Sequence, residues 1–156
     1  MRLMHSIAFI CSANVCRSLM AHAILASEVA RRQLAVRVLS AGVSSGFEGM
    51  LAAREARLVC DRHKTPMPKF IATHIASEDL SGVRRLFAME RSNIASLSAH
   101  TTLSPDRVSL LGEFDPEDRG SEIDDPIGQD GVAFERCYQR LHDCIFHYLD
   151  TTRDFD

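Results

Sequence analysis

The fold of this chain is decided by the stretch CSANVCRS, residues Cys11 to Ser18. It follows a short apolar run, Ile7–Ile10, whose β-branched and aromatic residues predict a buried strand. It precedes Leu19–Ala26, which is rich in strong helix formers. The stretch therefore forms a turn from a strand into a helix, where backbone N–H groups converge and the helix dipole is positive. Such a turn binds anions, phosphate above all.

Two side chains in this turn add the means for a reaction. Cys11 stands at the strand end and Arg17 at the helix start, and nearby positive charge at a helix N-terminus favours the thiolate of a cysteine over its thiol. The planar guanidinium of Arg17 can bind two phosphate oxygens at once. Ser18 is placed to hydrogen-bond the sulfur, and Asn14 suits a positive φ, which a tight anion-binding turn needs. A buried cysteine in a helix cap beside a surface arginine is the alternative interpretation.

The loop pattern resembles that of the low-molecular-weight protein tyrosine phosphatases. Their loop usually reads Cys-x-Gly-Asn-x-Cys-Arg-Ser-Pro; here Ala13 takes the place of the glycine and Leu19 that of the proline. The resemblance implies that Cys11 and Arg17 are catalytic. Because Arg17 and the loop amides supply positive charge, we expect neither a metal nor a cofactor. The remaining loop residues are expected to bind the substrate phosphate: Ser12, Ala13, Asn14, Val15, Cys16 and Ser18.

A general acid is expected in the acidic, turn-rich segment 114–131. Loops of this length in a small domain are usually functional or disordered. Asp125 precedes Pro126 and matches the family's Asp-Pro acid motif in residue type and chain order. We therefore expect the Asp125 carboxyl to protonate the leaving oxygen. Asp124 is the competing candidate.

The expected cleft walls differ from the family pattern. The family has an aromatic residue in the loop that corresponds to residues 44–49, so Phe47 either walls the cleft or simply packs there. Family members active on tyrosine phosphates often carry aromatics after the acid, whereas Ile127 follows here and is the expected contact. The segment Phe70–Thr73 lacks the family histidine that supports the loop asparagine. The sequence therefore leaves open whether the substrate is a phosphorylated protein or a small phosphomonoester.

These features predict a cysteine-dependent phosphatase that hydrolyses phosphotyrosine or aryl phosphate monoesters through a cysteinyl-phosphate intermediate. Two other functions stay open. An arsenate reductase on the same scaffold needs relay thiols, and Cys137 and Cys144 are seven residues apart, although that spacing also fits one buried helix face. A phosphate-binding module without turnover is the third possibility.

The rest of the chain predicts one α/β domain over residues 1–156. It is expected to be a three-layer sandwich with a mostly four-stranded parallel sheet between helices, because strands and helices alternate. The predicted strands are residues 7–10, 35–40, 83–89 and 108–111, and the predicted helices are residues 16–32, 50–63, a short one from 90, and 132–149.

Composition and net charge argue against a nucleic-acid-binding protein and against a membrane protein. The net charge is -3, so no overall basic field draws the chain to nucleic acid or to a membrane surface. No apolar run approaches the ~20 residues of a membrane span. Five cysteines without a Cys-x2-Cys pair, in a sequence that lacks a convincing signal peptide, indicate free thiols and a cytoplasmic location. The sequence does not predict an oligomeric state.

Overall fold

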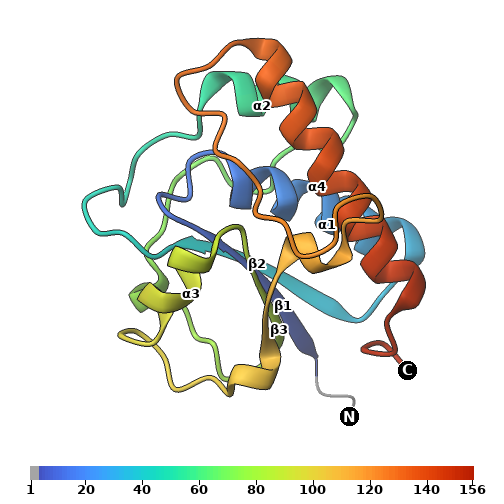
Figure 1. Cartoon of the computed structure of the whole chain (residues 1–156). Coiled ribbons are helices and arrows are strands. Elements are labelled where there is room, and N and C mark those ends of the chain that lie inside the picture. Colours follow the sequence, from blue (N-terminus) through green and yellow to red (C-terminus); the bar gives the residue numbers. More distant parts are fainter. Residues whose placement is uncertain (1–3) are drawn as a thin grey trace.

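Four parallel strands form the centre of the structure, a computed structural model that describes residues 4–156 (Figure 1). Their order is β2-β1-β3-β4, so β1 lies between two neighbours, with Ile10 opposite Ala41 on one side and Ala88 on the other. The predicted parallel sheet is thereby confirmed. The strands are β1 (His5–Cys11), β2 (Val36–Gly42), β3 (Val83–Ala88) and β4 (Val108–Leu110).

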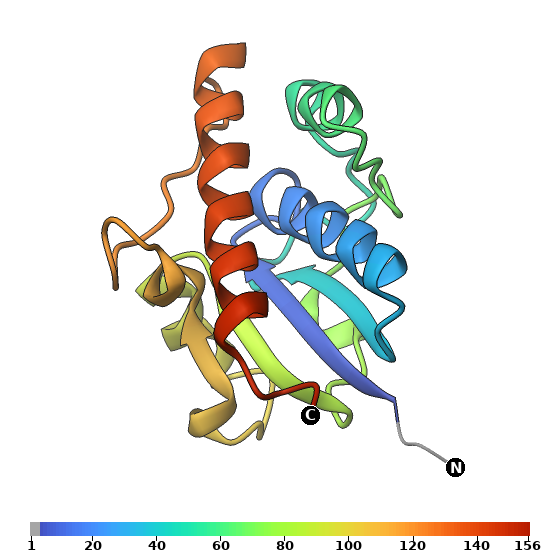
Figure 2. The same ribbon diagram turned by 90° about the vertical axis from the view of Figure 1, so that its right-hand side faces the viewer.

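Helices cover both faces of the sheet, as the sandwich prediction requires (Figure 2). One face carries three helices that contact one another, and the other carries a shorter helix with a one-turn 3₁₀ segment. The first group comprises α1 (Arg17–Arg32), α2 (Arg54–Arg62) and α4 (Gly131–Thr151); the second comprises α3 (Arg91–Leu97) and η1 (Ile75–Ser77). Two further 3₁₀ turns, η2 (Pro105–Arg107) and η3 (Leu111–Phe114), flank β4.

Strand β1 separates the two hydrophobic cores. Its side chains alternate, so Ile7, Phe9 and Cys11 belong to the core under α1, α2 and α4, whereas Ala8 and Ile10 belong to the core on the α3 face. All five residues are buried. The alternation places Cys11 at the carboxyl end of β1 on the face of the long helices, and ligands of parallel sheets bind at that end.

The prediction for α2 was wrong at its start. The helix begins at Arg54, not at Met50, because the preceding residues form a short antiparallel pairing with a distant segment. The Ala72 N–H donates to the Met50 carbonyl at 2.8 Å, and the Ala52 N–H donates to the Phe70 carbonyl at 2.7 Å. Backbone groups used in this pairing are lost to a helix, and the pairing leaves Met50 in a loop.

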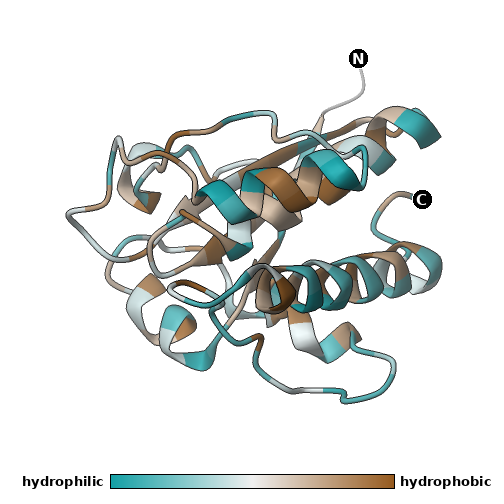
Figure 3. Ribbon diagram, turned by 90° about the horizontal axis from the view of Figure 1, so that it is seen from above, coloured by the Kyte–Doolittle hydropathy of each residue, from teal (hydrophilic) through white to brown (hydrophobic). Residues whose placement is uncertain are grey.

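The last helix is amphipathic. Hydrophilic and hydrophobic residues alternate around α4 (Figure 3), and its buried side chains form one stripe. Within residues 4–156, no helix is both long enough and apolar enough to cross a membrane. The buried positions of α4 are Phe134, Cys137, Tyr138, Leu141, Cys144, Ile145, Tyr148 and Leu149.

Candidate active site

The loop between β1 and α1 is held by main-chain hydrogen bonds to the residues that follow β2. Asn14 has φ 61°, as its residue type predicts. The Cys11 carbonyl accepts a hydrogen bond from the Val43 N–H at 3.0 Å, and the Ser12 carbonyl accepts one from the Ser44 N–H at 2.9 Å. These bonds turn loop carbonyls outward and leave loop N–H groups for an anion. Helix α1 also begins without a side-chain cap or an acidic residue in its first turn, so its dipole is not neutralised there.

The Cys11 sulfur lies inside this loop. It is 3.3 Å from the Asn14 backbone N–H, which donates to it, and 3.0 Å from Ser18 Oγ. Because Asn14 Nδ2 donates to Ser18 Oγ at 2.6 Å, the hydroxyl hydrogen of Ser18 is free to donate to the sulfur. Two donors directed at one sulfur suit a thiolate.

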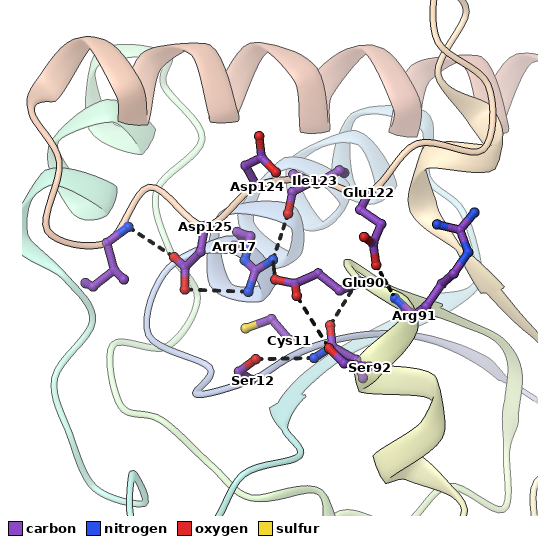
Figure 4. A network of polar contacts seen from close by, with 12 residues as sticks. Cys11, Ser12, Arg17, Glu90, Arg91, Ser92, Glu122, Ile123, Asp124 and Asp125 are labelled. Atoms are coloured by element: carbon purple, nitrogen blue, oxygen red, sulfur yellow. Dashed lines mark hydrogen bonds and ion pairs between the residues drawn. The ribbon is translucent and has the colours of Figure 1, made fainter.

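Arg17 is buried beside the sulfur, with only 1% of its surface exposed. Its Nη1 donates to Glu90 Oε1 and, at 2.7 Å, to the Ile123 carbonyl (Figure 4). Burial alone would lower the pKa of the guanidinium, but the charge of Cys11, the hydrogen bond that Arg17 donates to Glu90 and the charge of Asp125 outweigh burial and raise that pKa. Arg17 Nε is buried and has no hydrogen-bond partner among residues 4–156, which fits a donor meant for an anionic ligand.

The structure separates the two candidate acids. Asp125 Oδ2 lies 3.5 Å from Arg17 Nη2, and Asp125 Oδ1 accepts a hydrogen bond from the Ile127 N–H at 3.1 Å. Asp124 points towards α4 and away from Cys11 (Figure 4). Asp125 is therefore the carboxyl that the fold brings to Cys11 and Arg17.

A cavity of about 200 Å³ opens at the loop. The structure places both predicted wall residues there, with Phe47 36% and Ile127 54% exposed. It adds Met50, which the sequence reasoning missed because it assigned that residue to a helix. The cavity is lined by Cys11, Ala13, Val15, Cys16, Arg17, Phe47, Met50, Asp125 and Ile127.

The Asn14 side chain is supported even though the segment Phe70–Thr73 lacks the family histidine. The Thr73 backbone N–H donates to Asn14 Oδ1 at 3.0 Å, so a main-chain group takes the place of the missing histidine side chain. Ser12 is held as well, because Asn93 Nδ2 donates to Ser12 Oγ at 3.3 Å. A main-chain donor leaves no signature in the residue type, so residue types alone could not predict the role of Thr73.

The other cysteines near the site are buried thiols. Burial raises the pKa of Cys16, and burial raises the pKa values of Cys137 and Cys144 to about 12. The Cys137 sulfur lies 4.0 Å from the Asp124 carbonyl. These environments favour the protonated thiol at neutral pH, so none of the three is prepared to act as a nucleophile.

Comparison with known proteins agrees with this geometry. The family model for low molecular weight phosphotyrosine protein phosphatase matches residues 6–153. The human protein of that name is 30% identical, with 93% of this chain and 94% of the human protein covered. Low molecular weight protein-tyrosine phosphatase A of Mycobacterium tuberculosis is 32% identical, with 89% of this chain and 86% of that protein covered.

Solved structures give the same result. The crystal structure of a low molecular weight protein tyrosine phosphatase from T. tengcongensis superposes with a TM-score of 0.85 at 25% identity, covering 95% of this chain and 99% of that one. The family model extends over nearly the whole chain, and the relatives match from end to end. The chain therefore belongs to the low molecular weight phosphotyrosine protein phosphatases, a family of phosphoric monoester hydrolases.

Proposed function

We propose that this phosphatase hydrolyses phosphotyrosine or other aryl phosphate monoesters through a cysteinyl-phosphate intermediate, with Cys11, Arg17 and Asp125 as its catalytic residues. One observation carries the proposal: the sulfur and the buried guanidinium of the loop 11–18 line the same cavity as the Asp125 carboxyl, which lies more than 100 residues later in the chain. Charge complementarity at a preformed oxyanion site is usually the largest contribution to catalysis of this kind.

In the first step the Cys11 thiolate attacks phosphorus, forming an S–P bond while the P–O bond to the leaving group breaks. Arg17 and the loop N–H groups bind the non-bridging oxygens and stabilise their charge. Asp125 donates its proton to the leaving oxygen.

In the second step Asp125, now a carboxylate, takes a proton from water as that water attacks the cysteinyl-phosphate. The O–P bond forms, the S–P bond breaks, and Cys11 leaves as a thiolate. Ser18 supports both steps, because its hydroxyl donates to the sulfur from 3.0 Å. The products are inorganic phosphate and an alcohol or phenol.

The cavity walls support an aryl leaving group. Phe47, Met50 and Ile127 are the cavity's exposed apolar lining residues, whereas Cys11 and Arg17 in the same lining are buried. A flat apolar group that carries a phosphate matches this division. Ile127 has no aromatic face to stack on a phenyl ring, so we propose small aryl phosphates beside phosphotyrosyl proteins as substrates.

The first test is hydrolysis of para-nitrophenyl phosphate by the wild-type protein and by Cys11→Ser. We expect Cys11→Ser to lower kcat by roughly 10⁴-fold or more, since the nucleophile is lost. Excess chelator should leave the wild-type rate unchanged, because Arg17 and the loop amides supply the positive charge. Undiminished turnover by Cys11→Ser would reject the mechanism.

The second test assigns the acid, with Asp124→Asn as the matched control for Asp125→Asn. We expect Asp125→Asn to lower kcat by about 10²–10⁴-fold and Asp124→Asn to have little effect. The loss in Asp125→Asn should be larger for phenyl phosphate than for para-nitrophenyl phosphate, whose leaving group needs less help from a proton. The reverse order of the two variants would move the acid role to Asp124.

The buried thiols favour hydrolysis over arsenate reduction. A reductase on this scaffold requires relay cysteines, and burial keeps Cys137 and Cys144 protonated by raising their pKa values to about 12. Thioredoxin-coupled reduction of arsenate by the wild-type protein would contradict this assignment. Phosphate binding without any turnover of aryl phosphates would instead indicate a binding module.

A further inference from the structure

Lys69 is half-buried. It lies in segment 69–73, which supports the proposed phosphate-binding loop, residues 11–18, called the phosphate loop below. Its Nζ donates to the Ser40 carbonyl of β2 at 2.8 Å and to Thr73 Oγ1 at 2.7 Å. Burial lowers the pKa of Lys69, and the negative charges of Glu78 and Cys11 act in the opposite direction. The ammonium group thus has two hydrogen-bond acceptors, and the negative charges of Glu78 and Cys11 favour its protonated form.

A continuous set of hydrogen bonds connects Lys69 to the sulfur. Lys69 binds the Thr73 side chain, and the Thr73 backbone N–H donates to Asn14 Oδ1 at 3.0 Å. Asn14 Nδ2 donates to Ser18 Oγ at 2.6 Å, and Ser18 Oγ lies 3.0 Å from the Cys11 sulfur. Every member of this set belongs to the loop or holds it.

We propose that Lys69 is a positioning residue that fixes the phosphate loop through Thr73 and contributes positive charge that favours the Cys11 thiolate. The inference rests on the proposed function of Cys11. Lys69 does not line the substrate cavity, so it acts through other residues. It holds the Thr73 side chain, and the Thr73 backbone N–H in turn holds Asn14.

The position of Thr73 shows why an anchor is needed. Its carbonyl accepts a hydrogen bond from the Gly42 N–H at 2.9 Å, so its peptide is held between β2 and the loop. Asn14 has φ 61°, a conformation that costs free energy unless its side chain is held. Lys69 bridges Thr73 to the Ser40 carbonyl and keeps this peptide in place.

The charges around Lys69 leave its own charge effective at neutral pH. Glu78 Oε1 is within 3.3 Å of Thr73 Oγ1 and is the acidic neighbour of Lys69. On α1, His22 Nδ1 contacts Ser40 Oγ at 2.8 Å, and burial together with the charge of Lys69 lowers the pKa of His22 to about 4. His22 is therefore uncharged at neutral pH, so it adds no second positive charge beside Lys69.

The test compares Lys69→Met with Lys64→Met, since the chain has two lysines and Lys64 is exposed. The pH dependence of kcat and KM is measured with para-nitrophenyl phosphate. We expect Lys69→Met to lower kcat/KM about 10-fold, mainly through kcat. The acid limb of its kcat/KM profile should move to higher pH, because the thiolate loses a cation. Lys69→Arg should restore most of the activity, and Lys64→Met should match the wild type.

A second variant keeps the test decisive if Lys69→Met fails to fold. Thr73→Val removes the hydroxyl that Lys69 binds but leaves the backbone N–H, so we expect a smaller shift in the same direction. An acid limb unchanged in both Lys69→Met and Thr73→Val, or a Lys64→Met variant equally impaired, overturns the inference. If the wild type itself fails to turn over substrate, the proposed function fails. The inference is then decided by calorimetry with inorganic phosphate, which Lys69→Met should bind about 10-fold more weakly.

Discussion

Arg17 is the residue on which the charge balance of the site depends. It is almost fully buried, and its cationic group has an anionic partner in Glu90 and a second, more distant one in Asp125. An isolated buried charge is costly, whereas a paired and hydrogen-bonded one is tolerated. Glu90 and the Ile123 carbonyl therefore orient the guanidinium before any substrate arrives.

We expect Glu90→Gln to lower kcat/KM by about 10-fold and to destabilise the fold by about 1–3 kcal/mol, because Arg17 keeps a hydrogen-bond acceptor but loses its counter-charge. Steady-state kinetics and urea unfolding measure the two effects. Glu90→Asp, which keeps the carboxylate, is the matched control and should retain most of the activity. Wild-type kinetics in Glu90→Gln would show that Arg17 does not need this partner.

His22 makes the stability of the protein depend on pH. Burial, and after it the charge of Lys69, lowers its pKa from 6.5 to about 4 in the folded state. Between these values the unfolded chain binds a proton that the folded chain does not, so stability is fully present above pH 6.5 and falls as the pH drops towards 4. The loss amounts to roughly 3 kcal/mol.

Urea unfolding at pH 7, 6 and 5 measures this effect in the wild type and in His22→Gln. We expect the variant to show a flatter dependence, since glutamine does not titrate, while the exposed His147→Gln control keeps the wild-type slope. Equal slopes in all three proteins would assign the acid sensitivity to carboxylates elsewhere.

At the scale of elements, Gly42 at the end of β2 packs so closely against the phosphate loop that a side chain has no room there. A Cβ at Gly42 would lie 2.8 Å from both the Ala13 carbonyl carbon and the Ser12 carbonyl oxygen. These are backbone atoms, which cannot rotate away as a side chain does. Gly42, the last residue of β2, thus sets the position of the loop 11–18.

Gly42→Ala should therefore displace the loop. We expect it to lower kcat/KM by about 10-fold or more and to cost about 1–3 kcal/mol of stability, as overpacking commonly does. Gly82→Ala is the matched control, because a Cβ there has no neighbour closer than Ser6 Oγ at 3.8 Å. Full activity in Gly42→Ala would mean that the loop adapts without loss.

At the scale of the whole molecule, the sequence was sufficient for the parallel sheet and for the loop. Both depend on local signals: short apolar runs predict strands, and the order of Cys11, Asn14 and Arg17 predicts an anion-binding turn. Asp125 followed from a motif, and the structure brings it beside Arg17 at 3.5 Å. Its role as the acid remains a prediction.

What the sequence did not reveal depends on contacts between distant segments. The start of α2 was misplaced because Met50 and Ala52 bond to residues 70–72, a pairing that no local pattern encodes. Glu90 and Thr73 act on the loop from 73 and 59 residues away along the chain. Because these contacts join residues so far apart in the chain, the spacing of residue types does not predict them.

Anion binding should stabilise the whole fold, since the loop joins β1, α1 and β2. We expect inorganic phosphate at 100 times its Kd to add about 2.7 kcal/mol to the free energy of unfolding, which thermal unfolding detects as a rise in Tm. Chloride at equal ionic strength is the control. Arg17→Lys should lose most of the rise, because an ammonium lacks the two-donor geometry; a rise of wild-type size in that variant would contradict the assigned phosphate site.

The central place of β1 in the sheet has a consequence for synthesis in the cell. Its last residue, Cys11, is the proposed nucleophile, and the strand pairs with β2 and also with β3, whose residues 83–88 are made much later. A nascent chain on the ribosome holds the reactive cysteine long before it holds the strand beside it or the aspartate that would complete the site. The proposed active site can therefore assemble only after the chain has been made as far as Asp125.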